Sequence, residues 1–313
     1  MLAIGHEFEV IRNMNSTADA FAADILQLLP VDEWFTLRDT LKENWPTYAY
    51  HYYWVENAIQ WKKQNPNIKH DIYCPEGKLS TGVFIGISTF SGFRVYPFAT
   101  GSSQNLLHKS LLESQRLDWN TGIVIAAVHE HIQPTVYSVL ADLKSQRGLE
   151  IDFSIPGQYY FKSVEECATV KIQIPEECYV MRLNKSHVSQ ILAIWPHRHA
   201  TRPELSMAYL QLLVEMNTSV GLFLRKNDAL VSWVLQNEWG GLGMVQTIEE
   251  YKRRGYAKTV VKVLAKEIAD FGLSSVLFIV KGNASSHEMF TSLNWKRMND
   301  ILWIVMKEYE TRT

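Results

Sequence analysis

The chain has 313 residues, of which 47% are hydrophobic and 20% charged, a composition typical of a globular protein with a sizeable core. Its formal net charge of −2 gives no overall attraction to nucleic acid or to an anionic membrane, so we expect neither as a partner. No apolar run reaches membrane-spanning length, and the N-terminus lacks the basic-then-apolar order of a signal peptide.

The cysteine count points away from a disulfide framework and from a zinc site. Cys74, Cys167 and Cys178 are too few and too scattered for either. We therefore expect free thiols, no bound metal and a cytoplasmic protein, with a mitochondrial location as the open alternative. At roughly 150 residues per domain, the length predicts two domains.

The N-terminal half reads as a mixture of helices and strands. Apolar residues recur at helical spacing from residue 17 until Pro30, and a second helix is expected over 31–41. The aromatic stretch over residues 48–54 is typical of a core or an interface. Further along, we expect strands over 83–87, 93–98 and 123–128, and helices over 103–114 and 135–146.

Charged and turn residues gather between residues 163 and 177, where we place a domain boundary. The predicted domains are residues 1–170 and 178–313. In the second domain we expect strands over 180–183, 221–224, 229–236, 242–247 and 276–280, and helices over 186–195, 203–216, 257–271 and 284–293. Phe271 is expected on the apolar face of its helix, with Gly272 as the left-handed cap.

A basic loop, residues 252–258, lies between the strand over 242–247 and the helix that follows. The first amides of a helix have no partner within the helix, and together with the helix dipole they form an anion site. Gly255 lets a phosphate approach the backbone, and Ala257 keeps the next contact small. The loop therefore predicts a diphosphate as its guest.

Two common phosphate motifs do not fit this loop. A Walker A loop needs glycines where Lys252 and Ala257 stand. The dinucleotide fingerprint fails because Gly241 and Gly243 are followed by Gln246 at the third position and precede a strand.

The loop instead resembles the pyrophosphate loop of the GNAT acetyltransferase superfamily, Q/R-x-x-G-x-G/A, written here as Lys252-x-x-Gly255-x-Ala257. A second match follows the next strand, where many members carry N-x-x-A-x-x-L-Y-x-x-x-G-F. Asn283, Met289, Phe290 and Trp295 occupy positions of that motif, Ser286 stands in the small place, and Asn294 replaces the turn glycine. Within the superfamily, the segment from Met244 to Ala257 is similar to the glycine N-acyltransferase group.

This resemblance implies an α/β GNAT fold with a mixed, mostly antiparallel central sheet flanked by helices. The strand over 123–128 and its helix parallel the strand over 276–280 and its helix, so we expect two tandem GNAT-like domains with the N-terminal one degenerate and without cofactor. The implied co-substrate is acetyl-CoA or another acyl-CoA. The expected cofactor contacts are Val245, Gln246, Thr247, Lys252, Arg253, Arg254, Gly255, Tyr256, Ala257, Lys258, Asn283, Ser286 and Phe290.

The resemblance further implies an N-acyltransferase in which a small amine or amino acid attacks the thioester carbonyl directly. The Val245 amide is expected to polarise the carbonyl oxygen. The family positions for the general base and the general acid carry Gly241 and Phe290 here. Gly241 cannot accept a proton, and Phe290 cannot donate one. We therefore expect Glu238 as the base, with an exposed hairpin carboxylate as its alternative, and Ser286 as the substitute acid.

Two other functions stay open on the same residues. Gly241 and Phe290 are compatible with a coenzyme A binding module that has lost catalysis. The aromatic N-terminal half is compatible with a protein-interaction module. A homodimer is an open alternative for the assembly.

Overall fold

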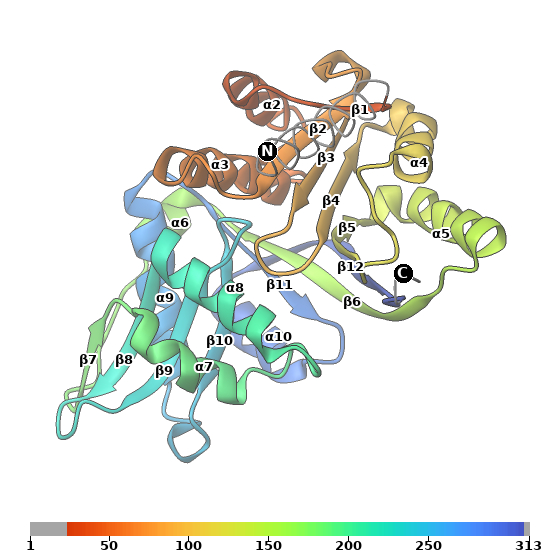
Figure 1. The fold of residues 1–313 in the computed structure, drawn as a ribbon. Coiled ribbons are helices and arrows are strands. Elements are labelled where there is room, and N and C mark those ends of the chain that lie inside the picture. The colour runs from red at the N-terminus through yellow and green to blue at the C-terminus, as the bar shows by residue number, and fades with distance from the viewer. Residues whose placement is uncertain (1–23, 310–313) are drawn as a thin grey trace, which may run out of the picture.

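The computed structural model of the protein describes residues 24–309, and within them one sheet of 12 strands carries helices on both faces (Figure 1). The strand order is β1-β2-β3-β4-β5-β12-β6-β11-β10-β9-β8-β7. Most neighbours are antiparallel, and the pairs β4–β5 and β10–β11 are parallel. The mixed, mostly antiparallel central sheet flanked by helices that the sequence predicted is confirmed.

The strands are β1 (Leu26–Leu28), β2 (His70–Pro75), β3 (Val83–Ser88), β4 (Arg94–Ala99), β5 (Val124–His129), β6 (Ile151–Lys162), β7 (Cys178–Met181), β8 (Ser219–Leu224), β9 (Leu230–Gln236), β10 (Leu242–Thr247), β11 (Ser275–Val280) and β12 (Lys296–Met306). The α-helices are α2 (Trp34–Thr40), α3 (Ala49–Gln64), α4 (Gln104–Glu113), α5 (Gln133–Arg147), α6 (Val164–Ala168), α7 (Val188–Ile194), α8 (Pro203–Met216), α9 (Tyr256–Asp270) and α10 (Ala284–Ser292).

The centre of the sheet joins the two halves of the chain. β6, from the end of the N-terminal half, pairs with β11 of the C-terminal half, while β12, at the end of the chain, pairs with β5 of the N-terminal half. β6 and β12 also pair with each other along most of their length. The last strand of each half therefore pairs with a strand of the other half. As a result, the strands follow in the same order on both sides of the β6–β12 pair.

The N-terminal half builds its part of the core around α3 and its aromatic residues. Tyr50 and Trp54 are buried and pack against β4, β11 and Trp239 of the C-terminal half, as expected for the aromatic stretch. Tyr53 accepts a hydrogen bond from the Ser274 amide at 2.7 Å, which ties α3 to the turn before β11.

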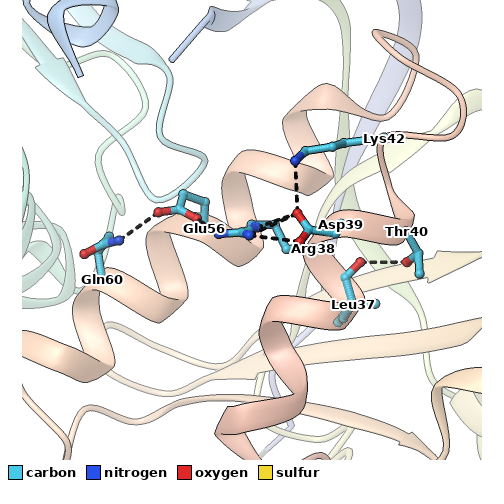
Figure 2. Close-up of polar contacts among 7 residues, drawn as sticks. All are labelled: Leu37, Arg38, Asp39, Thr40, Lys42, Glu56 and Gln60. Carbon is cyan, nitrogen blue, oxygen red and sulfur yellow. Dashed lines mark hydrogen bonds and ion pairs between the residues drawn. The ribbon is translucent and has the colours of Figure 1, made fainter. Parts of the chain in front are cut away.

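A polar network fastens α2 to α3 on the outside of this half (Figure 2). Arg38 reaches Glu56 at 2.7 Å and Asp39 at 3.0 Å, and Asp39 also pairs with Lys42 at 3.1 Å. Gln60 donates to Glu56 from the next turn of α3. Because these side chains are partly exposed, the network orients α2 more than it stabilises the fold.

In the C-terminal half, the side chains of β9 pack into two separate layers of the core. Trp233 and Leu235 pack against α7 and α8, whereas Val231 and Val234 pack against α9. α7 and α8 therefore cover one face of the strands β8–β10, and in Figure 1 they lie in front of the sheet. α9 and α10 share the core on the opposite face.

The structure corrects two expectations from the sequence. The described part of the first predicted helix is the edge strand β1, because residues 26–28 pair with β2; residues 17–23 lie outside the described residues. Phe271 is 75% exposed, because α9 ends at Asp270 and the chain turns away at Gly272, whose φ of +76° confirms the expected cap.

His70 is buried in an aromatic shell on the inner side of β2. Its ring lies 4.7 Å from Trp54, 5.3 Å from Trp61 and 5.9 Å from Tyr96, measured between ring centroids. Neither ring nitrogen has a hydrogen-bond partner in the described residues. Burial, with a smaller contribution from Lys62, lowers the pKa of His70 from 6.5 to about 3, so the ring is neutral at physiological pH.

We predict that His70 makes the fold sensitive to mild acid. Its folded pKa lies below the unfolded value, so its contribution to stability is fully present above pH 6.5 and is lost as the pH falls toward 3. At pH 5 the loss is about 2 kcal/mol. In urea unfolding at pH 7 and pH 5, His70→Phe should lose less stability between the two pH values than the wild type. An equal loss in both proteins would contradict the assignment.

Candidate functional site

β10 opens away from β11 after a single pair of residues. Leu242 pairs with Leu277, and β10 then bulges between Gly243 and Gln246, with Met244 at a φ of +51°. A bulge turns the strand and increases its twist. The backbone of β10 beyond Leu242 therefore faces a gap in the sheet rather than β11.

The amides of this stretch alternate between β9 and the gap. The Ile248 amide donates to the Val231 carbonyl of β9 at 2.9 Å. Because successive amides of a strand point to opposite sides, that of Thr247 points away from β9 and toward the gap. Val245 lies within the bulge, between Gly243 and Gln246. Thr247 bonds Ser232 through its hydroxyl group, and the Gln246 Oε1 atom is buried without a partner.

The basic loop lies at the end of β10 that opens. Arg253 and Gly255 have φ values of +61° and +82°, a backbone pattern that turns neighbouring amides to one side. The first bond of α9 runs from the Thr259 amide to the Gly255 carbonyl, so the three amides before Thr259 have no partner within the helix. No side chain caps this helix end.

The side chains of the loop leave these amides uncovered. Lys252 pairs with Glu249 at 2.6 Å, and Arg254 lies over the Tyr251 ring at 5.2 Å. Apart from its chain neighbours, nothing comes within 4 Å of a Cβ built at Gly255. The loop therefore has space for a phosphate group at its glycine, and Arg253 and Lys258 are exposed beside it.

The Tyr256 side chain points the other way and anchors α9. It is 2% exposed, and its hydroxyl group donates to Glu177 at 2.7 Å at the start of β7. Burial and then this carboxylate raise the pKa of Tyr256. A ligand at the loop could therefore contact Tyr256 through its backbone but not through its side chain. Ala257 is half-buried behind the loop.

The residues of the second predicted motif have two different roles at α10, because some cap the helix and others pack in the core. The Asn283 side-chain oxygen accepts from the Ser286 amide at 3.2 Å, so Asn283 caps the helix and keeps its NH₂ group as a donor. Phe290 is 4% exposed and packs edge-on against Trp295 in the core. Ser286 is half-buried in the first turn of α10.

Glu238 is a buried carboxylate and not the exposed hairpin residue that the sequence left as an alternative. It is 3% exposed, in the turn between β9 and β10. The Tyr209 hydroxyl group of α8 donates to its Oε2 atom, and Arg94 Nη1 of β4 lies 3.5 Å from its Oε1 atom. Burial and the nearby carboxylate raise the pKa of Tyr209 well above its usual value, so the phenol stays protonated.

The turn that carries Glu238 is organised by Asn237. The Asn237 side-chain oxygen accepts from the amides of Trp239 and Gly241. Gly241 is closely packed, because a Cβ there would lie 2.4 Å from the Val276 carbonyl oxygen of β11. This position therefore has no room for the glutamate that the resemblance would place near it.

Sequence reasoning missed Arg94 and Tyr209. Arg94 lies over the Tyr209 ring at 4.6 Å, and its Nε atom is buried without a hydrogen-bond partner. Neither residue belongs to a recognisable motif, and they are separated from Glu238 by long stretches of chain. Only the packing of β4 against α8 brings them together.

Residues 24–309 contain neither a cluster of metal-ligand side chains nor a helix suited to span a membrane. No group of three or more His, Cys, Asp or Glu side chains in this range could hold a metal ion. None of the helices described there is both long and apolar enough to cross a membrane. Cys74, Cys167 and Cys178 are buried and unpaired, as expected.

We predict that Arg94 and Glu238 are strongly coupled in stability. Arg94→Met leaves a buried carboxylate with only Tyr209 as its partner, which should lower the free energy of unfolding by about 2–3 kcal/mol. Arg94→Met combined with Glu238→Gln should recover much of this loss. Urea unfolding of the two single variants and the double variant measures the coupling, and additive losses would argue against it.

Comparisons with known proteins were made over the whole chain. Residues 219–304 match the model of a family described as FR47-like protein. No curated protein matches. A Drosophila protein of known crystal structure is 23% identical, with a TM-score of 0.81, and the match covers 91% of this chain and 99% of that chain. This likeness shows a shared fold.

Two other solved structures are more distant. A tandem GNAT protein from the clavulanic acid biosynthesis pathway is 11% identical with a TM-score of 0.49, and the match covers 91% of this chain and 100% of that chain. A Pyrococcus horikoshii protein titled a putative acetyltransferase is 9% identical with a TM-score of 0.49, covering 91% and 89%. Over residues 219–304 the chain is thus similar to FR47-like proteins, and the opened strand, basic loop and capped α10 in that segment support the resemblance to the GNAT superfamily.

Proposed function

We propose that the protein is an acyl-CoA-dependent N-acyltransferase that moves an acetyl or other acyl group to a small amine or amino acid, as in the glycine N-acyltransferase group. The observation that carries this proposal is the opening of β10 from β11 directly before the uncovered amides at the start of α9. An extended thioester with a diphosphate at one end fits both features, because the gap takes the arm and the loop takes the phosphates.

The residues at this end of the sheet divide the binding tasks. The amides of residues 255–258 and the charges of Arg253, Arg254 and Lys258 hold the diphosphate. The NH₂ group of Asn283 faces the amide-bearing arm of the co-substrate. The Val245 amide polarises the thioester carbonyl, which places the acyl group beside the bulge.

The transfer forms one C–N bond and breaks one C–S bond. A neutral amine attacks the thioester carbonyl carbon, and the proton that the nitrogen sheds passes to Glu238. Because Glu238 lies upstream of the Leu242–Leu277 pair, before β10 opens, we place ordered water between the amine and its carboxylate. The departing thiolate takes up a proton and leaves as the free thiol, with Ser286 as the predicted donor, whose hydroxyl group regains its proton from water.

The buried pair Arg94 and Glu238 favours an acceptor that carries both signs of charge. Glu238 attracts the amine, and the unsatisfied Nε donor of Arg94 is suited to a carboxylate. Both side chains lie beside α8, across the sheet from α9. The acceptor would therefore approach from the face opposite to the cofactor loop.

A coenzyme A binding module without catalysis is the alternative. It is favoured by Gly241, which has no room for a base, and by Phe290, which is buried and cannot donate a proton. Free thiol release from acetyl-CoA in the presence of a panel of amines and amino acids separates the two functions, because only the enzyme releases thiol in an acceptor-dependent way.

We predict that a side chain at Gly255 blocks co-substrate binding. Gly255→Glu puts a carboxylate where the diphosphate should sit, so the affinity for acetyl-CoA measured by calorimetry should fall at least about 100-fold. Gly272→Glu is the matched control, because Gly272 has a similar φ of +76° and equally open surroundings at the other end of the helix. Equal affinity in both variants would remove the loop from the binding site.

A second prediction concerns Glu238. Glu238→Gln keeps the hydrogen bond from Tyr209 but removes the base, so kcat should fall about 100-fold or more with little change in acetyl-CoA affinity. Thiol release and calorimetry on the same preparation give both quantities. Unchanged turnover would exclude Glu238 from the reaction while leaving the binding proposal intact.

A further inference from the structure

A cavity of about 230 Å³ lies between α9, the segment after α6 and the end of α10, apart from the opened strand. Three lysines line it, Lys162, Lys171 and Lys262, and none of its lining residues is acidic. Its floor is apolar and includes Val261, Ala265 and Trp295. Three cations in one small cavity are unusual for a chain whose net charge is −2.

Lys162 is the most informative of the three. It is 6% exposed, and its Nζ atom donates to the Leu293 carbonyl at the end of α10 at 2.6 Å. An ammonium group has three donors, so this bond leaves donors of a buried charge to be satisfied. Capping the helix end accounts for one donor only.

The other two lysines are also without an acidic partner. Neither Lys171 nor Lys262 forms an ion pair with any described carboxylate. Glu166 interacts electrostatically with Lys162 but does not line the cavity, and its carboxylate is bound to Lys296 at 3.2 Å and to the Ser163 amide. No carboxylate lines the cavity, and Lys171 and Lys262 have no ion-pair partner among the described residues.

We propose that this cavity is a binding site for a phosphate monoester. Such a group carries close to two negative charges at neutral pH and several acceptor oxygens, which matches three ammonium groups better than a single carboxylate does. The apolar floor would contact the organic part of the ligand. The site is separate from the amides of the cofactor loop, which hold their ligand through the backbone.

Two sources of this group are compatible with the position of the cavity. Lys262 follows Lys258 of the cofactor loop by four residues, one turn or about 6 Å along α9, so the two lie on the same side of the helix. The 3′-phosphate of coenzyme A is one source, and this case rests on the proposed function. A free phosphorylated small molecule is the other.

Calorimetry on the full-length protein tests the site with three probes, namely inorganic phosphate, coenzyme A and 3′-dephospho-coenzyme A. The test variant is Lys171→Gln with Lys262→Gln. The matched control is Lys69→Gln with Lys226→Gln, which removes two exposed lysines far from the cavity in sequence. We expect the test variant, and not the control, to bind inorganic phosphate about ten-fold or more weakly than the wild type.

The two forms of the coenzyme distinguish the sources. If the coenzyme supplies the phosphate, the wild type prefers coenzyme A to the dephospho form, and the test variant loses this preference without losing affinity for the dephospho form. If a free ligand supplies it, both forms bind equally and phosphate binds in addition to them.

Equal phosphate affinity in the test variant and the control would overturn the proposal, as would the absence of both phosphate binding and any preference for coenzyme A. Phosphate binding without binding of either coenzyme would instead contradict the proposed function and leave the phosphate site standing.

Discussion

The pairing of β6 with β12 is the interaction on which the rest of the molecule depends. These two long strands satisfy each other's backbone groups and then each pairs with the opposite half of the chain. Neither half can complete its part of the sheet without a strand from the other, because an unpaired strand in the middle of a sheet would leave its amides and carbonyls without partners. The exchange also fixes the distance and orientation between the halves, and so allows Arg94 of β4 to meet Glu238 in the turn before β10.

The two faces of the C-terminal half differ in chemistry. The α9 side carries uncovered amides and a cavity lined by lysines, which suit phosphate groups. The α8 side carries aromatic rings and one buried ionic cluster, Arg94, Tyr209 and Glu238, which suits a small polar molecule. In the proposed acyl transfer this separation would let each ligand enter without displacing the other.

Several buried polar atoms have no hydrogen-bond partner among the described residues. His70, Arg94 and Gln246 each keep a buried polar atom without a partner. Such atoms reduce stability, and proteins retain them mainly where a ligand or a change of state uses them. Around Arg94 and Gln246 this is consistent with a polar acceptor, whereas His70 lies in a closed aromatic shell and acts through the pH dependence of folding.

The sequence by itself determined the local parts of the site. The conformations of the loop glycine, the apolar face of α9 and the capping Asn283 depend on neighbours within a few residues, so the local sequence pattern indicates them. The same holds for most strands and for the left-handed cap at Gly272. Only the tertiary structure decided which residues meet across the sheet. Residues 26–28 form a strand because β2 lies beside them, and β6 and β12 acquire their place from pairing with distant strands. Glu238 is buried rather than exposed because Arg94 and Tyr209, brought close by packing of the two halves, supply the charge and the hydrogen bond that its burial requires.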